Sequence, residues 1–112
     1  MADARHNELV RIADGDGPGA ASARTALGGG PVRKRLRASI CALAEHRGVA
    51  SSTCPSDAAR AVGGAQWREL MDEARELARE LAASGVVDIM QRGKVIDPQA
   101  QWRGPIRIRK RA

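Results

Sequence analysis

The order of the secondary-structure elements expected between residues 32 and 110 constrains the fold of this 112-residue chain more than any other feature. Periodic apolar residues, glycines and prolines predict helices at residues 32–47, 55–62 and 66–84, a brief strand at 49–54, and extended stretches at 86–90, 94–97 and 106–109. Three helices followed by paired strands make an α+β domain. This order is typical of a winged helix, a three-helix helix-turn-helix core with a small antiparallel β-hairpin attached as the wing.

The helices are predicted from apolar stripes and from the residues that begin or end them. In the first helix, Leu36, Ile40 and Leu43 share one face, and Gly48 is placed to end the helix. Pro55 suits the first position of the second helix, because its missing N–H has no helical partner there. The third helix carries a longer apolar stripe, formed by Leu70, Ala74, Leu77, Ala78 and Leu81.

The extended stretches contain one strictly alternating segment. Ile106 and Ile108 are expected to point inward, with Arg107 and Arg109 pointing outward. Either residues 94–97 or residues 106–109 pair with residues 86–90 as the principal hairpin. We favour 106–109 as the final strand and residues 92–104 as the wing.

Residues 1–31 are expected to form a disordered or flexible N-terminal arm in front of a winged-helix domain at residues 32–112. The segment 13–30 is rich in glycine and almost free of large apolar side chains. Such a segment buries too little surface to offset the entropy lost on ordering. Only residues 7–12 have the spacing for a turn of helix.

The chain contains no apolar run near the roughly 18 residues of a membrane span, and its first ten residues lack the apolar centre of a signal peptide. We therefore expect a cytoplasmic protein. Cys41 and Cys54 are then expected to be reduced thiols.

Four runs of residues resemble a small bacterial family of domains of unknown function. They are Pro55-Ser56 with Ala59-Arg60 and Gly63; Trp67-Arg68 with Leu70-Met71; Arg75 with Ala78, Leu81 and Gly85; and Arg103-Gly104-Pro105-Ile106-Arg107. The resemblance covers about residues 32–109. It implies a winged-helix-like fold, and it assigns no activity and no catalytic residue.

The net charge of +6 lies entirely in the predicted domain, since residues 1–31 sum to −1 and residues 32–112 sum to +7. A basic domain of this kind favours a polyanionic partner, and duplex DNA is the first expectation. The alternative is a protein–protein interaction module that binds no nucleic acid. RNA or ribosome association is a third possibility, because it shares the charge argument. The sequence does not indicate an oligomeric state.

The candidate nucleic-acid-binding residues lie on the first helix, the third helix, the wing and the last strand. They are Arg33, Lys34, Arg37, Arg68, Arg75, Arg92, Lys94, Arg103, Arg107 and Arg109. The helix at 66–84 is the expected recognition helix, but its five acidic and three basic residues suit a phosphate-lined groove poorly. Contact is therefore expected mainly through the first helix, the wing and the tail. The alternatives are a solvated helix end at residues 33–37 and, at residues 107–109, a strand edge kept charged against edge-to-edge pairing.

No catalytic or metal site is expected. Cys41, His46 and Cys54 lack the ligand spacing of structural zinc, and no spacing pairs either cysteine with His46 as a nucleophile and base. We therefore expect no cofactor and no enzymatic activity. Trp67 and Trp102 are expected to cover the small core, with stacking on bases as the alternative.

Overall fold

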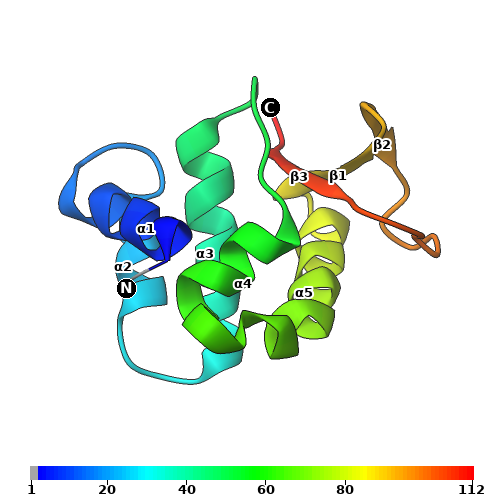
Figure 1. Cartoon of the computed structure of the whole chain (residues 1–112). Helices are drawn as coiled ribbons and strands as arrows, with labels where there is room; N and C mark the ends of the chain where they lie inside the picture. Colours follow the sequence, from blue (N-terminus) through cyan, green and yellow to red (C-terminus); the bar gives the residue numbers. More distant parts are fainter. Residues whose placement is uncertain (1–2) are drawn as a thin grey trace.

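The computed structural model describes residues 3–112 as an α+β arrangement of helices and one small sheet (Figure 1). In chain order the elements are α1 (Ala4–Asp14), α2 (Ala20–Leu27), α3 (Val32–Arg47), α4 (Pro55–Gly63), the 3-10 helix η1 (Gly64–Leu70), α5 (Met71–Ala83), β1 (Val87–Gln91), β2 (Lys94–Ile96) and β3 (Arg107–Lys110). Helices α3, α4 and α5 form the centre of the molecule. Helices α1 and α2 lie on one side of it and the sheet on the other.

The core is built from the apolar stripes that the sequence predicts. Leu36, Ile40 and Leu43 of α3 are fully buried, and they meet Leu77 and Leu81 of α5 within one cluster of apolar side chains. The predicted bounds of α3 are confirmed, and Gly48 follows it with a φ of 71° that favours glycine. Helix α4 begins at Pro55, as predicted. The order of α3, α4, α5 and the sheet is compatible with a winged-helix-like fold.

The predicted long helix at 66–84 is wrong at its N-terminal end. Residues 64–70 form η1, and α5 begins only at Met71, so α3 is the longest of the described helices. The cause is a close approach at Gly63, where an added Cβ would lie 2.8 Å from Leu70 Cδ1 and 3.6 Å from Trp67 Cβ. The packing of Leu70 and Trp67 against Gly63 brings residues 64–70 into the tighter turns of a 3-10 helix. Arg68 therefore lies on η1 rather than on α5.

The sheet has the strand order β2-β1-β3, with both pairs antiparallel. Both candidate stretches thus pair with β1, one on each edge. Arg92 and Gly93 join β1 to β2 with φ values of 52° and 78°, the positive pair of a tight two-residue hairpin turn. The brief strand predicted at 49–54 is reduced to one bridge, in which Thr53 and Ile108 exchange backbone hydrogen bonds of 2.8 and 2.7 Å.

Residues 3–31 differ from the expected flexible arm, because they contain α1 and α2. Leu9 and Ile12 of α1 and Ala23 and Ala26 of α2 are buried against the rest of the core. This segment orders despite its small residues because alanine loses little side-chain entropy on ordering, and small residues allow close helix contact. At Gly19, an added Cβ would lie 2.6 Å from the Ala42 carbonyl oxygen of α3. The predicted turn at residues 7–12 lies within α1.

None of the helices within residues 3–112 is long and apolar enough to cross a membrane.

Candidate nucleic-acid interface

Arg33, in the first turn of α3, is held against the acidic face of α5. Its guanidinium forms a hydrogen-bonded ion pair with Glu80 and lies 3.8 Å from Glu73 and 3.9 Å from Glu76. The hydrogen bond with Glu80 raises the pKa of Arg33 above its ordinary value. The structure thus turns this predicted phosphate contact toward carboxylates of the same chain.

A further candidate, Arg75, and Arg79 one turn later hold the wing against α5. Arg79 donates hydrogen bonds to the carbonyl oxygens of Pro98 and Ala100, the latter at 2.9 Å, and Arg75 donates to Gly104 at 3.3 Å. Their guanidinium carbons lie 4.1 Å (Arg79) and 5.8 Å (Arg75) from the centroid of the Trp102 ring. This flank of the expected recognition helix is therefore covered by the loop at residues 97–104.

The last strand shows the predicted alternation, but its arginines contact polar groups of the same chain. Ile106 and Ile108 are buried, whereas Arg107 donates to Ser52 Oγ at 2.9 Å and to the Ser52 carbonyl oxygen at 3.0 Å. Arg109 lies 3.7 Å from the carboxylate of Asp88, which also pairs with Arg111 at 3.0 Å. The predicted row of free cations on β3 is thus partly neutralised.

The remaining candidates are six cations whose side chains have no hydrogen bond or ion pair within residues 3–112: Lys34, Arg37, Arg68, Arg92, Lys94 and Arg103. Lys34 and Arg37 line a hollow of about 280 Å³ between α3 and α2, and Arg68 stacks on Trp67 at 4.6 Å. The other three belong to the wing. The ten candidates therefore do not converge on one surface.

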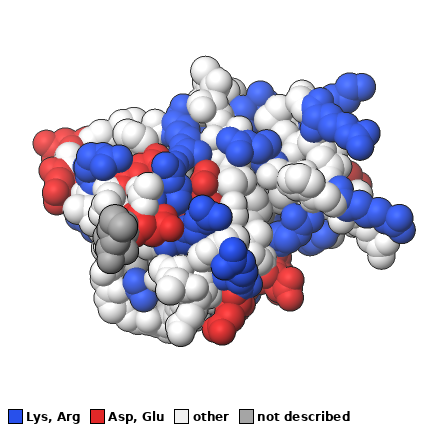
Figure 2. All heavy atoms as spheres, in the orientation of Figure 1, with Lys and Arg blue, Asp and Glu red and all other residues white. Residues whose placement is uncertain are grey.

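Cationic and anionic side chains are unevenly distributed over the face shown in Figure 2. Lys and Arg side chains gather over the projecting wing, at the right of the view, and continue toward the centre. Asp and Glu side chains gather near α1 and along the lower edge. The wing is therefore the basic part of this face that extends furthest from the acidic N-terminal end.

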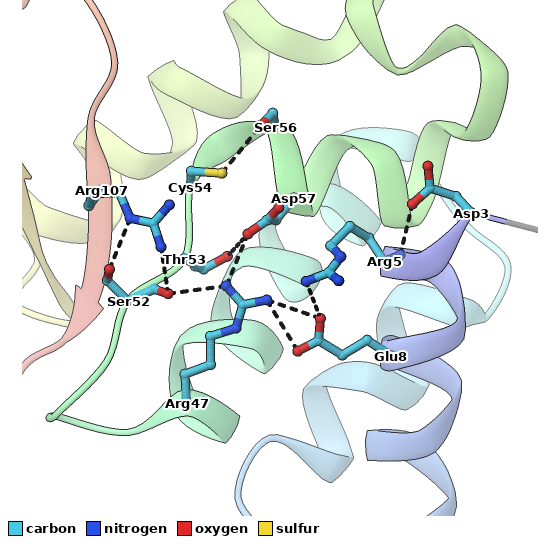
Figure 3. A network of polar contacts seen from close by, with 10 residues as sticks. All are labelled: Asp3, Arg5, Glu8, Arg47, Ser52, Thr53, Cys54, Ser56, Asp57 and Arg107. Atoms are coloured by element: carbon cyan, nitrogen blue, oxygen red, sulfur yellow. Dashed lines mark hydrogen bonds and ion pairs between the residues drawn. The ribbon is translucent and has the colours of Figure 1, made fainter.

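A polar network missed by the sequence analysis joins α1, α3 and α4 (Figure 3). Arg47 pairs with Glu8 at 3.0 Å and with Asp57 at 3.0 Å, and it donates to the Ser52 carbonyl oxygen at 3.1 Å. Burial would raise the pKa of Asp57, but hydrogen bonds from Arg47 and Thr53 outweigh burial and lower it. Long sequence separations hide such pairing, because no local pattern links Glu8 to Arg47.

The cysteines are placed as structural groups. Cys41 is half-buried, and burial raises the pKa of its thiol, which disfavours the reactive thiolate. Cys54 lies within 3.1 Å of the Ser56 hydroxyl. No group of three or more His, Cys, Asp or Glu side chains among residues 3–112 is arranged to hold a metal ion.

Comparison with protein families identifies one match, described as "Protein of unknown function (DUF3253)", over residues 33–111. The match includes α3 to α5 and the sheet, and it excludes α1 and α2. Comparison with curated proteins found no significant match.

Proposed function

We propose that this chain, which belongs to the DUF3253 family of proteins of unknown function, binds nucleic acid, in the first place duplex DNA, through its wing. The observation that carries the proposal is the set of wing cations. Arg92, Lys94 and Arg103 are exposed, and their side chains have no polar partner within residues 3–112. Such cations can neutralise phosphates and release condensed counterions, which is the main source of sequence-independent affinity for DNA.

The backbone at Arg92 supports a functional role for its side chain. Arg92 is the one non-glycine residue with positive φ among residues 3–112, in a turn that favours Asn or Gly. A left-handed conformation costs a residue with a Cβ roughly 1–2 kcal/mol. Strained residues of this kind cluster at functional sites. A contact between the exposed guanidinium of Arg92 and a ligand would account for this conformational cost.

Helix α5 supplies little for reading bases. Arg75 and Arg79 donate to wing carbonyls, and the exposed Asp72 and Glu76 would face phosphates unfavourably. The proposed mode is therefore backbone contact by the wing, with weak sequence specificity and strong dependence on salt.

Fluorescence anisotropy with a labelled mixed-sequence duplex tests the proposal, at several salt concentrations. Wild-type protein should bind, and Arg92→Gly should bind more weakly with a salt slope smaller by about one unit. Because glycine relieves the positive φ, the same variant should unfold at a higher temperature. Weaker binding by a more stable protein cannot be attributed to misfolding.

Arg11→Ala is the matched control, since Arg11 is an exposed arginine of α1 with no side-chain partner within residues 3–112. It should leave the affinity and slope unchanged. If wild-type protein at tens of micromolar shows no binding to the duplex in low salt, the proposal is refuted. Tighter binding to duplex RNA of the same sequence would replace DNA by RNA as the partner.

A protein partner is the second candidate function. The observation that favours it is an acidic pair at the junction of η1 and α5, where Glu69 and Asp72 are exposed and have no ion pair within residues 3–112. Affinity capture from nuclease-treated native extract distinguishes the two candidates. A stoichiometric partner that is retained by wild type and lost by Glu69→Lys/Asp72→Lys favours the protein module.

A further inference from the structure

A second group of cations lies at the turn between α4 and η1, away from the wing. Arg60 of α4 and Arg68 of η1 both stack on the indole of Trp67, with guanidinium carbons 4.4 and 4.6 Å from the ring centroid. Both arginines are exposed, and Trp67 is partly buried against the core. The side chain of neither arginine has a hydrogen bond or ion pair within residues 3–112.

The stack on Trp102 shows what is unusual about the stack on Trp67. Around Trp102, both arginines direct N–H groups to carbonyl oxygens of the wing, so stacking and hydrogen bonding together fix a loop. Around Trp67, the stacking geometry is similar, but the N–H groups of Arg60 and Arg68 reach no protein acceptor within residues 3–112. A stacked guanidinium keeps its five N–H donors at the edge of the plane, where they suit an oxyanion.

The backbone beneath this stack is tightly constrained. Gly64 has a φ of 57°, which favours glycine, and a Cβ added at Gly63 would lie 2.8 Å from Leu70 Cδ1 and 3.6 Å from Trp67 Cβ. Trp67 therefore follows a turn that favours glycine at position 64, and its Cβ lies close to Gly63. A rigid indole restricts both arginines before any ligand arrives, which lowers the entropy lost on binding.

We infer that Arg60, Trp67 and Arg68 form a second phosphate-binding surface, which takes the phosphodiester backbone of the same duplex that the wing contacts. This inference rests on the proposed nucleic-acid function. A hollow of about 330 Å³ lies beside the stack, lined by Gly64, Ala65, Trp67, Arg68 and Asp3. The Asp3 carboxylate already accepts the Arg5 N–H at 2.7 Å as the N-cap of α1.

The fold places the stack and the wing at different points along α5. Helix η1 leads directly into α5. The wing follows α5 through β1 (Figure 1), and it is attached to α5 by hydrogen bonds from Arg75 and Arg79. An α-helix of 13 residues is about 20 Å long. Arg75 and Arg79 are the fifth and ninth of these residues, so the wing loop meets the middle of α5, whereas the stack lies before its first residue. A duplex that bridges the two basic surfaces would not need α5 to read bases.

Salt-dependent anisotropy of full-length single variants tests the inference. Arg60→Ala and Arg68→Ala should each lower the salt slope by about one unit, so that the loss of affinity between about 50 and 200 mM salt becomes roughly 4-fold smaller. Arg60→Lys and Arg68→Lys should keep the wild-type slope but bind more weakly, because lysine retains the charge and loses the planar stack. Arg11→Ala should match wild type in both respects.

The outcomes separate the two proposals. Wild-type slopes in both alanine variants, with normal binding and a lowered melting temperature, would show a merely structural stack and overturn the inference while leaving the wing proposal intact. The inference also fails if these variants keep wild-type slopes and lose a protein partner from nuclease-treated extract. Failure of wild type to bind any duplex would remove the proposed function and the second surface together.

Discussion

Arg33 and Glu80 form an ion pair across 47 positions of sequence, joining the first turn of α3 to the last turns of α5. This contact places a cation among three carboxylates of α5. It also offsets the unfavourable positive charge in the first turn of α3. A basic first turn opposes the helix dipole, and α5 carries an excess of negative charge. Each helix thus compensates the unfavourable charge of the other.

Reversing one member of this pair should destabilise the protein, and reversing both should restore it. Arg33→Glu is expected to lower the melting temperature, because it adds a fourth acidic group beside Glu73, Glu76 and Glu80. Arg33→Glu/Glu80→Arg should recover most of the loss. Thermal denaturation at low and high salt measures both effects, and high salt should shrink them because the groups are exposed. Lys34→Glu is the control on the same turn, and an equal loss there would refute the specific pairing.

Arg47→Ala should be the most damaging exchange of any charged residue in the α1–α3–α4 network. It leaves the carboxylates of Glu8 and Asp57, both mostly buried, without their shared cation. Loss of one member of a largely buried pair costs about 3 kcal/mol when burial is deep, so about 2 kcal/mol is expected here. Urea unfolding measures the change, with the exposed Arg37→Ala on the same helix as control. Equal free energies for the two variants would contradict the network's role.

Acid should weaken the protein partly through Asp57. Because the folded state lowers the pKa of Asp57 below its ordinary 3.8, this carboxylate contributes stability above pH 3.8 and loses the contribution as pH falls through its folded pKa. Asp57→Asn removes that contribution, so it should destabilise the protein at pH 7 and differ less from wild type near pH 3. Unfolding free energies at both pH values test the sign. A gap that widens in acid would show that the pKa is raised instead.

Gly19→Ala should show whether α2 packs as closely on α3 as the structure indicates. The new Cβ would lie 2.6 Å from the Ala42 carbonyl oxygen, at a residue whose φ is +89°. We expect a loss of about 2 kcal/mol from the strained backbone and the displaced helix. Gly17→Ala is the matched control, since no atom lies within 4 Å of its added Cβ. Hydrogen exchange of α2 amides should rise in Gly19→Ala alone, and equal exchange in both variants would argue against close packing.

Local signals predicted the parts of the fold that depend on neighbouring residues. Gly48 ends α3, and Pro55 begins α4. Each depends on a conformational preference of the residue itself. The start of α5 was misplaced because the closure of Leu70 onto Gly63 is a packing contact that no apolar period records.

Neither the N-terminal helices nor the partners of the arginines could be predicted from the sequence, because both depend on contacts between residues far apart in the chain. Alanines of α2 gain stability only when α3 is close enough to receive them, and composition does not reveal that fit. Likewise, the sequence shows Arg33 and Arg107 as equal cations. Only the fold shows that one reaches Glu80 and the other Ser52, whereas Lys94 on the wing stays exposed.

The shared carboxylate pair around Arg47 has a consequence for where this molecule can be divided. Asp57 lies within the segment matched by the family, and Glu8 lies before it. A fragment cut at the start of the match would keep the arginine, lose one of its two anions, and uncover the apolar side of α3 that α1 and α2 shield. In this chain the segment matched by the family and the packed core have different boundaries.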